Sequence, residues 1–327
     1  HRLLEYNPRD GAFQRTEENP LPADVVIIDE ASMIDLPLMD HLLRALDPKS
    51  RLILIGDVDQ LPSVGPGNVL RDLIESRAVP VATLRQIFRQ AAESLIVVNA
   101  HRLLEGKALW LPDAAAGKDF AFVARDGPEE ILAALKDLVQ EEIARQAGDP
   151  FSSGVQVLTP MNRGLLGTIR LNQELQELLN PAGETVGSAG ARLRLGDRVM
   201  QLRNNYEKGV FNGDLGKIAA VDKTAGKITV DFDGVRVAYE SDDLDELSLA
   251  YATSVHKSQG SEYPVVVIPL HTSHYMMLYR SILYTALTRG KQRVILVGSR
   301  KAVALATRNV RVERRFTGLR GRLMSRP

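Results

Sequence analysis

Five short apolar runs alternate with segments of helical periodicity, and this alternation limits the chain to a small group of folds. The apolar runs are bounded by glycine, proline or polar residues and lie at residues 25–28, 52–55, 155–158, 265–268 and 294–297. Segments with helical spacing lie between them, at residues 38–46, 91–104, 129–145 and 165–179. Strands that alternate with helices form parallel sheets covered on both faces. The sequence therefore predicts an α/β fold with buried strands.

Residues 191–247 depart from this pattern. They have little helical periodicity and contain short β-rich runs, joined by Asn-Gly-Asp and Asp-Gly turn sequences at residues 212–214 and 233–234. We predict a small β-barrel inserted into a second α/β domain, and we interpret the acidic run at residues 240–246 as a solvated loop. Near the start, residues 6–19 contain an Asp-Gly turn sequence that is typical of a β-hairpin.

The composition excludes several kinds of site. The chain has 327 residues, no cysteine and a formal net charge of +0. Disulfides, thiolate catalysis and cysteine-bound metals are therefore excluded, whereas a nucleic-acid channel needs only a local basic lining. The longest apolar runs are far shorter than the ~20 residues that span a bilayer. We expect a cytoplasmic protein with no membrane partner. No leader sequence opens the chain, and because residues 1–4 are typical of the inside of a domain, we expect a fragment of a longer protein.

A pair of carboxylates ends the first apolar run. Asp29 and Glu30 directly follow the strand predicted at residues 25–28. In a nucleotide hydrolase, the first carboxylate of such a pair can hold Mg²⁺ and the second can activate the attacking water. The alternative interpretation is a strand followed by an acidic helix start, because acidic residues favour the first turn of a helix.

The second apolar run ends in a loop rich in glycine and proline, at residues 56–65. Loops at the carboxyl ends of adjacent parallel strands line the same crevice, so Gln60 of this loop is expected near Asp29 and Glu30. An amide at that place could sense a γ-phosphate through a hydrogen bond. Without the neighbouring carboxylates, the same glycines and prolines would indicate only a turn.

Three further segments carry polar residues beside predicted strands, at residues 84–90, 252–262 and 283–290. Arg89 lies in the first of them and Arg289 in the last. A lone arginine is usually a solvated surface residue. Here, however, two arginines lie at the edges of a second α/β domain, which would face the strand that ends in Asp-Glu. This arrangement indicates arginine fingers, which stabilise the charge on a transferred phosphoryl group.

In order, these motifs resemble those of the RecD-like superfamily-one DNA helicases, the family of the alpha subunit of exodeoxyribonuclease V. The motifs are Asp-Glu-Ala-Ser, Gly-Asp-x-x-Gln-Leu-Pro-Ser-Val-Gly, Phe-Arg-Gln, His-Lys-Ser-Gln-Gly-Ser-Glu and Tyr-Thr-Ala-x-Thr-Arg. Each motif alone is weak, but five in this order over nearly the whole chain make the resemblance specific. It implies two RecA-like domains of the P-loop type, ATP in the cleft between them, single-stranded DNA across both, and 5′→3′ unwinding of duplex DNA.

The resemblance also implies domain boundaries. Residues 1–86 would form a truncated first RecA-like domain, with the hairpin at residues 6–19 as the pin that splits the duplex. Residues 87–190 and 248–327 would form the second RecA-like domain. Residues 191–247 would form the inserted SH3-like β-barrel.

For the nucleotide, the resemblance implies ATP and Mg²⁺ as cofactors and assigns roles by motif position. Asp29 would hold Mg²⁺, Glu30 would serve the catalytic water, and Gln60 would couple the γ-phosphate to DNA. Arg89 and Arg289 would reach the γ-phosphate from the second domain. On the nucleotide side of the fifth motif, the binding residues would be Gln259, Gly260 and Glu262, the last of them at the ribose.

For DNA, the resemblance implies a single strand and a duplex fork as partners, with other recombination or repair proteins as further partners. The residues that would contact DNA are Pro62, Ser63, Thr253, His256, Lys257 and Ser258. With 5% aromatic residues, backbone contacts are expected to dominate, and we interpret the one tryptophan, Trp110, as packing rather than stacking on bases. The seven arginines among the last twenty residues leave two alternatives open, a DNA contact or a disordered tail.

Two other interpretations of the whole chain are open. One is a different branch of the same enzymes, such as the helicase portion of a conjugative relaxase. The residues before His1 would identify a relaxase, because it would carry a metal-binding histidine cluster and a tyrosine nucleophile there. The other is a catalytically inert module that binds single-stranded DNA.

The 327 residues contain no Gly-x-x-x-x-Gly-Lys-Ser/Thr sequence, which is the phosphate-binding loop of this class. Without such backbone amides and a lysine around the β- and γ-phosphates, Mg·ATP loses its main anchor. We predict that the 327-residue polypeptide binds ATP weakly and does not hydrolyse it. An ATPase assay with single-stranded DNA checks this, and robust DNA-stimulated turnover would contradict it.

Overall fold

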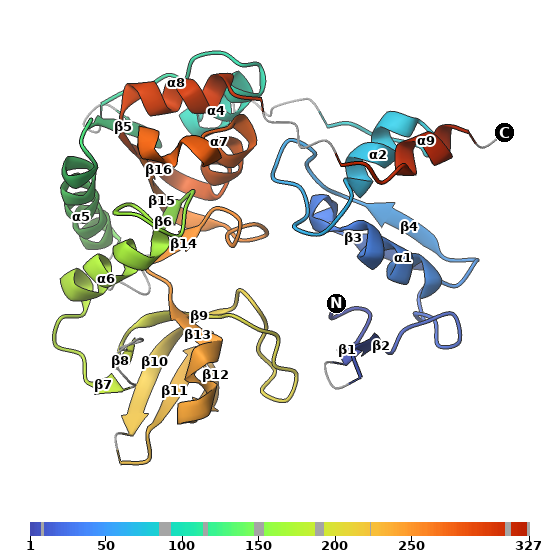
Figure 1. Cartoon of the computed structure of the whole chain (residues 1–327), viewed down its shortest axis with the longest axis horizontal. Helices are drawn as coiled ribbons and strands as arrows, with labels where there is room; N and C mark the ends of the chain where they lie inside the picture. Colours follow the sequence, from blue (N-terminus) through green and yellow to red (C-terminus); the bar gives the residue numbers. More distant parts are fainter. Residues whose placement is uncertain are drawn as a thin grey trace. The chain divides into compact units, whose positions relative to one another are not determined.

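The computed structural model describes residues 1–7, 10–84, 93–113, 117–146, 154–186, 193–222, 224–310 and 315–325. The chain divides into two compact units (Figure 1). Unit 1 comprises His1–Ile87 and Arg311–Pro327, and unit 2 comprises Phe88–Val310. The chain therefore passes twice from one unit to the other.

Unit 1 is built on two parallel strands, β3 (Val25–Ile28) and β4 (Arg51–Leu54). The first coincides with the predicted strand at residues 25–28, and the second lies one residue before the prediction. The helical segments of unit 1 are η1 (Ala31–Met33), α1 (Leu36–Arg44), α2 (Val69–Ser76) and α9 (Leu319–Met324). Asp35 caps α1, because its carboxylate accepts a hydrogen bond from the amide of Leu38 at 2.8 Å.

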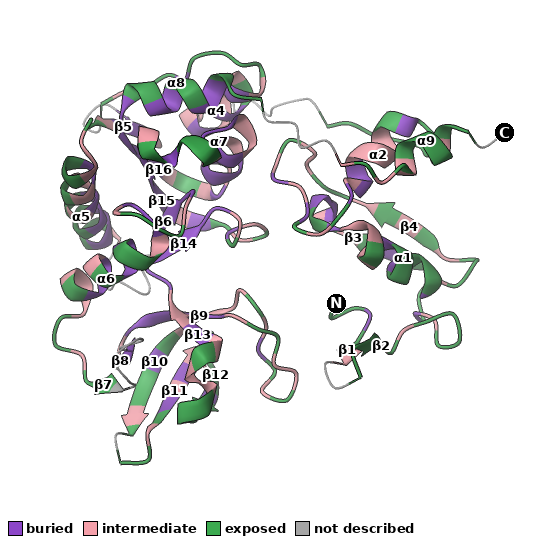
Figure 2. Cartoon of the chain, in the orientation of Figure 1, coloured by how far each residue is buried: buried purple, intermediate pink, exposed green. Residues whose placement is uncertain are grey.

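Only one face of the β3–β4 sheet is covered by the described residues. Val26 is buried in the core of unit 1, which it shares with Met39 and Leu42 of α1. Val25 and Ile27 are 47% and 58% exposed, because successive side chains of a strand point to opposite faces. Figure 2 shows exposed residues on β4 as well. The prediction of strands buried on both faces is therefore wrong for this unit.

The predicted hairpin near the start is present and short. β1 (Tyr6–Asn7) pairs antiparallel with β2 (Ala12–Phe13), and Gly11 supplies the turn with a φ of 63°, which glycine adopts without strain. The rings of Tyr6 and Phe13 meet edge to face, with centroids 5.2 Å apart, and Phe13 lies 4.7 Å from the ring of His41 on α1. Aromatic contacts thus fix the hairpin to α1. Its turn residues 8 and 9 lie outside the described residues.

The final described segment, residues 315–325, belongs to unit 1. We expected it in the second domain, as part of residues 248–327. It lies in unit 1 because α9 packs on α2, Leu319 packs against the unit 1 core, and Arg320 pairs with Glu75 of α2 at 2.7 Å. The described part of the arginine-rich tail is therefore a folded element of unit 1.

Arg315 anchors this segment to the loop that follows β4. Its guanidinium donates hydrogen bonds to the backbone carbonyls of Gly65 and Gly67 at 2.6 Å and to that of Ser63 at 2.7 Å. It also donates to the hydroxyl of Ser63 at 3.0 Å. One arginine thus satisfies three loop carbonyls, a geometry that suits the rigid fork of a guanidinium.

Unit 2 is built on a five-stranded sheet in which each strand runs parallel to its neighbours, in the order β14-β6-β15-β16-β5. The strands are β5 (Phe120–Ala124), β6 (Val155–Thr159), β14 (Ala252–Ser254), β15 (Tyr263–Leu270) and β16 (Gly290–Gly298). The predicted strands at residues 155–158, 265–268 and 294–297 are confirmed within longer ones. Their residues are buried on both faces, as Figure 2 shows for the centre of this sheet.

Helices cover both faces of the unit 2 sheet, as the α/β prediction requires. The helices are α4 (Leu95–Leu104), α5 (Pro128–Arg145), α6 (Thr168–Leu179), α7 (Arg280–Leu287) and α8 (Arg300–Arg308). α5 and α6 share one core with Val157, Val267 and Ile295. α4 and α7 contact β16, and Arg300 of α8 lies over the ring of Phe122, whose side chain faces away from that core. None of the helices in the described part of the chain is both long and apolar enough to cross a membrane.

A second, antiparallel sheet is inserted in unit 2, with the order β12-β11-β10-β9-β13. Its elements are β9 (Arg198–Gln201), β10 (Leu215–Asp222), β11 (Lys227–Phe232), β12 (Val235–Tyr239), η2 (Ser241–Glu246) and β13 (Leu247–Leu249), preceded by the pair β7 (Thr185–Val186) and β8 (Leu193–Arg194). The predicted turn at residues 233–234 is present, with both residues left-handed. The predicted β-barrel is not closed within the described residues, because the edge strands β12 and β13 do not pair there.

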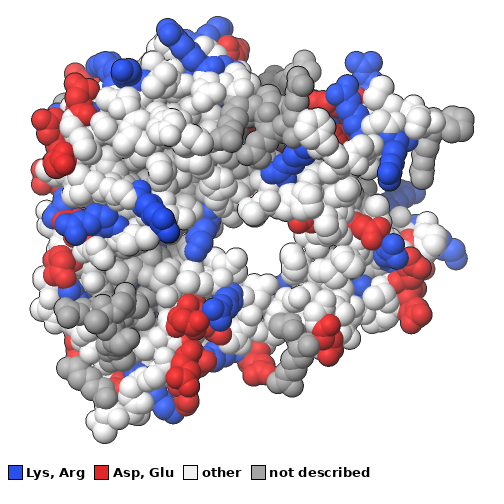
Figure 3. All heavy atoms as spheres, in the orientation of Figure 1, with Lys and Arg blue, Asp and Glu red and all other residues white. Residues whose placement is uncertain are grey.

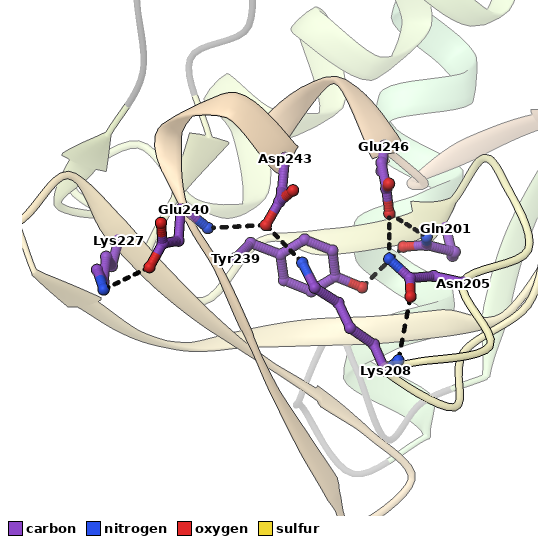
Figure 4. Close-up of polar contacts among 8 residues, drawn as sticks. All are labelled: Gln201, Asn205, Lys208, Lys227, Tyr239, Glu240, Asp243 and Glu246. Carbon is purple, nitrogen blue, oxygen red and sulfur yellow. Dashed lines mark hydrogen bonds and ion pairs between the residues drawn. The ribbon is translucent and has the colours of Figure 1, made fainter. Parts of the chain in front are cut away.

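The acidic run at residues 240–246 contains no buried residue, as expected for a solvated segment, but residues 241–246 form η2 rather than a loop. It holds the loop between β9 and β10 (Figure 4). Asp243 pairs with Lys208 of that loop at 2.6 Å. The carboxylate of Glu246 accepts a hydrogen bond from the side-chain amide nitrogen (Nδ2) of Asn205 at 3.2 Å. These contacts satisfy the positive charge of the loop within the inserted sheet.

A buried carboxylate joins the inserted sheet to the rest of unit 2. Asp197, between β8 and β9, accepts hydrogen bonds from Gln176 and Asn180 at 2.5 and 2.7 Å and from the hydroxyl of Tyr251 at 3.0 Å. Burial raises the pKa of Asp197. The next residue, Arg198, is also buried and donates to a carbonyl of β6 at 2.9 Å. The orientation of the insert is therefore set by polar contacts.

The position of Arg315 generates a stability prediction. We expect Arg315→Ala to lower the free energy of unfolding of unit 1 by about 2–3 kcal/mol, because the three loop carbonyls lose their charged donor and only the hydroxyl of Ser63 still donates to those of Gly65 and Gly67. Arg320→Ala is the matched control, and losing its exposed ion pair should cost less than about 1 kcal/mol. Urea unfolding, together with hydrogen exchange of residues 61–68, measures both. Equal effects of the two variants would contradict the assigned role of Arg315.

Candidate functional site

The carboxylate pair lies at the carboxyl end of β3. Asp29 is exposed and Glu30 is half-buried. One carboxylate oxygen of Asp29 accepts a hydrogen bond from the amide of Glu30 at 2.8 Å. Glu30 has a φ of 50°, a left-handed conformation that costs a non-glycine residue roughly 1 kcal/mol or more. This conformation turns the chain out of the strand and into η1, so that both carboxylates remain at the end of the sheet.

The loop after β4 lies against η1. The amide of Ala31 donates to the carbonyl of Ile55 at 2.8 Å, which joins the ends of the two strands. Gly56 permits this approach, because a Cβ there would lie 3.0 Å from the backbone nitrogens of Ala31 and Ser32. The structure thus places both predicted loops at one end of the sheet.

Gln60 is held by a turn within its own loop. Its side-chain amide nitrogen lies 3.4 Å from a carboxylate oxygen of Asp57, whose other oxygen accepts a hydrogen bond from the amide of Asp59 at 2.9 Å. Gln60 is half-buried. Asp57 therefore positions Gln60, a relation that sequence reasoning missed although an Asp two residues before another polar residue is a turn signal.

Pro62 and Ser63, both predicted to contact DNA, have different surroundings. Ser63 is buried, and its hydroxyl hydrogen bonds within the loop and to Arg315. Pro62 is half-buried, whereas the neighbouring Val64 is 90% exposed. In this structure Ser63 shapes the loop, and the exposed surface of the loop comes from other residues.

The residues around Asp29 are chemically suited to Mg²⁺. The second carboxylate oxygen of Asp29 has no hydrogen-bond partner among the described residues, and neither does the buried hydroxyl of Ser32. Oxygen donors are the ligands that this ion takes. The described residues contain no cluster of three or more acidic or histidine side chains that would form an all-protein metal cage. This is the usual arrangement for an ion shared between one or two carboxylates and substrate phosphates.

Arg289 lies at the amino end of β16, in unit 2. It is buried, and its guanidinium donates to the carbonyl of Ser261 at 3.1 Å. Its own carbonyl accepts from the amide of Tyr263 at 2.8 Å, which ties the start of β16 to the start of β15. The two predicted nucleotide segments of unit 2 therefore meet at one edge of the sheet.

The remaining nucleotide candidates of unit 2 lie in the segment that leads to β15. Glu262, at its end, pairs with Lys291 at 2.7 Å, a partner that sequence reasoning missed. Gly260 has a φ of 74°, a left-handed conformation, and Gln259 is half-buried. Arg89, the other predicted arginine finger, lies outside the described residues.

The segment after β14 separates the predicted DNA contacts into two groups. Thr253 and Ser258 are buried, and the hydroxyl of Ser258 donates to the carbonyl of Val255 at 2.8 Å. His256 is half-buried and Lys257 is exposed. Partial desolvation lowers the pKa of the Lys257 ammonium. In this structure Thr253 and Ser258 are buried within the turn, whereas the side chains of His256 and Lys257 are accessible at its surface.

Three protein-family models match successive parts of the chain. The AAA domain matches residues 2–120, and the UvrD-like helicase C-terminal domain matches residues 249–297. The SH3 domain of ATP-dependent RecD-like DNA helicases matches residues 171–232. The last match covers most of the inserted sheet and the helix before it.

Curated relatives align with almost the entire chain. The ATP-dependent RecD2 DNA helicase of Deinococcus radiodurans is 40% identical over 323 residues, which are 99% of this chain and 42% of that protein. The RecBCD enzyme subunit RecD of Mycolicibacterium smegmatis is 33% identical over 344 residues, 99% of this chain and 58% of that protein. The chain thus spans about half the length of these relatives.

Among solved structures, the crystal structure of Pif1 helicase from Bacteroides in complex with ADP-AlF3 and ssDNA has the same fold. It superposes with a TM-score of 0.54 at 18% identity, over 89% of this chain and 75% of that one. The predicted fold class, α/β with RecA-like domains, is confirmed. From its ordered motifs, the RecD-like SH3 match and these relatives, the chain belongs to the RecD-like DNA helicase family.

Proposed function

We propose that the chain is the motor part of an ATP-dependent 5′→3′ DNA helicase. The observation that carries this proposal is the pair Asp29–Glu30 at the carboxyl end of β3, beside the Gln60 loop of β4. Family membership supports it, because relatives of the chain are named as helicases. The direction of movement rests on the family resemblance alone. Assembly with other recombination or repair proteins is part of the proposal, because one relative is named as a RecBCD subunit.

In the proposed reaction, the residues of unit 1 act on the phosphates and on water. Asp29 holds Mg²⁺, which neutralises phosphate charge when it is bound. Glu30 orients the attacking water and accepts its proton. Gln60, positioned by Asp57, is the candidate that senses the γ-phosphate. The solved relative with ADP-AlF3 supports nucleotide binding by this fold.

Unit 2 contributes positive charge and a surface for DNA. We assign Arg289 to the γ-phosphate, and Gln259, Gly260 and Glu262 to the nucleotide. Arg89 belongs to the same proposal. His256 and Lys257 contact the phosphates of a single strand, because the turn after β14 leaves His256 partly and Lys257 largely accessible to solvent. The single strand in the solved relative and the term helicase in the names of relatives support this partner.

Glu30→Gln tests the enzymatic part of the proposal in a longer protein that supplies a phosphate-binding loop. We expect ATP hydrolysis stimulated by single-stranded DNA to fall by about 10²–10⁴-fold, because the amide cannot accept the proton. ATP binding, measured with a fluorescent analogue, should persist. Glu18→Gln, at an exposed glutamate of the same unit, is the control and should hydrolyse normally. Undiminished turnover by Glu30→Gln would refute its role as the base.

Lys257→Ala tests DNA binding in the 327-residue chain itself. We expect weaker binding to single-stranded DNA and a plot of log affinity against log salt that is flatter by about 0.7, the contribution of one phosphate contact on a single strand. Lys291→Ala is the matched control, because Lys291 is an exposed lysine already paired with Glu262. An unchanged salt slope for Lys257→Ala would place this side chain away from DNA.

A further inference from the structure

The five parallel strands of the unit 2 sheet all end along one edge. We name it the carboxyl edge. Lys257 follows β14 at one end of this edge, and Arg125 follows β5 at the other. Four inter-strand spacings separate β14 from β5, which is about 19 Å. The proposed DNA contacts at Lys257 therefore occupy only one end of a much longer edge.

Trp110 lies close to β5, the strand at the far end of the carboxyl edge. The carbonyl of Pro112, two residues after Trp110, accepts a hydrogen bond from the amide of Phe122 in β5 at 2.8 Å. The ring of Phe122 in turn lies under the guanidinium of Arg300, at the start of α8. The segment that contains Trp110 is therefore near both β5 and the start of α8.

The backbone of Trp110 is fixed while its ring faces solvent. The buried side chain of Asn99 on α4 donates to the carbonyl of Trp110 at 2.9 Å and accepts from its amide at 2.8 Å. The ring is nevertheless 52% exposed, and the guanidinium of Arg102 lies 4.9 Å from its centre. Trp110 therefore packs against Arg102 without being fully buried, and about half of its indole remains accessible to a ligand.

Further exposed aromatic and basic residues lie along the carboxyl edge between Lys257 and Trp110. Tyr275, in η3 (Thr272–Met277) just beyond β15, is 69% exposed. Arg300 and Lys301 follow β16 and are exposed, and Figure 3 shows Lys and Arg side chains over α8. Together with Arg125, Arg102 and Trp110, we call these residues the aromatic–basic row.

The charge of the row is positive and is not neutralised within the described residues. Arg125, Arg300 and Lys301 form no ion pair with a described carboxylate. The acidic start of α5, at residues 129–130, belongs to the helix on the opposite face of the sheet. Asp126, which directly follows Arg125, is exposed, but the four cations of the row outnumber it. The row is therefore locally basic, although the whole chain has a net charge of +0.

We propose that the aromatic–basic row is a second contact for single-stranded nucleic acid, in which a base stacks on Trp110 and the cations hold the intervening phosphates. Exposed aromatic rings interleaved with positive charge are the elements of a sequence-independent single-strand site. They favour this ligand over a protein surface, because charged residues are depleted from the centre of protein interfaces, whereas cations make up most of this row. The inference rests on the proposed function, because it extends the strand that lies on Lys257.

The single tryptophan of the chain makes the contact directly observable. The 327-residue chain is titrated with a fluorescein-labelled oligothymidylate of about 16 nucleotides, the upper end of typical site sizes. Label anisotropy reports binding, and tryptophan fluorescence of unlabelled titrations reports stacking on Trp110. We expect binding to quench the tryptophan fluorescence. An abasic oligomer of the same length, which has the phosphates without the bases, should leave it unchanged.

Substitutions at Trp110 and at a control position distinguish the loss of base stacking from a loss of folding. Trp110→Ala should weaken binding of the oligothymidylate by about 5- to 100-fold, the range for removing one stacked base, and Trp110→Phe should retain most of the affinity. Phe316→Ala is the matched control, because Phe316 is an exposed aromatic residue of unit 1, outside the row, and its loss should change nothing. Circular dichroism of the variants verifies that they fold.

Each outcome decides the proposal. The proposal is supported if the oligothymidylate quenches the tryptophan fluorescence and if, of Trp110→Ala and Phe316→Ala, only Trp110→Ala binds it more weakly. Two outcomes overturn the row and leave the proposed function intact. In one, anisotropy shows binding but the tryptophan fluorescence is not quenched. In the other, Trp110→Ala and the wild type bind with equal affinity; a protein surface would then be the ligand class to test. Absence of any binding by the wild-type chain overturns both the row and the proposed DNA contact.

Discussion

Parallel strand pairing is the constraint on which both units depend, because it brings the ends of all strands to two opposite edges of a sheet. In unit 1 the carboxylates and the Gln60 loop share the carboxyl edge of β3 and β4. Unit 2 uses both edges: Lys257 lies at the carboxyl end of β14, whereas Glu262 and Arg289 precede β15 and β16. One short segment, from Val255 to Glu262, leads from one edge to the other. A displacement of the residues at one edge can therefore be transmitted along this segment to the residues at the opposite edge.

The inserted sheet is attached to unit 2 by polar groups that are costly to bury. Asp197 and Arg198 are both removed from water, and the elevated pKa of Asp197 reflects that cost. An apolar junction would tolerate many orientations, whereas each hydrogen bond to Gln176, Asn180 or Tyr251 is lost if the sheet tilts. Tyr251, one of the partners of Asp197, directly precedes β14, so this junction connects the orientation of the insert to the start of β14.

The structural features that could be predicted from the sequence are those that depend on residues close together along the chain. The strand at residues 25–28 and the turn at residues 233–234 were predicted because apolar runs and Asp-Gly pairs act locally. The burial of Ser63 could not be predicted, because its partner Arg315 lies 252 residues away. The position of the Trp110 backbone depends likewise on Asn99 of another element. The roles assigned to site residues by family resemblance remain proposals, because they concern bound molecules and Arg89 lies outside the described residues.

Because α9 and Arg315 complete unit 1, this unit is not a continuous stretch of the chain. The AAA match at residues 2–120 omits both of them and includes α4 of unit 2, but it ends at Phe120, the first residue of β5. A gene fragment cut at those boundaries would encode an incomplete unit 1 together with a helix that has lost the sheet it covers. Recombinant expression of unit 1 alone would instead require residues 311–327 to be fused back to it through a linker, and a protease that cleaves between the units at one crossing would leave them joined at the other.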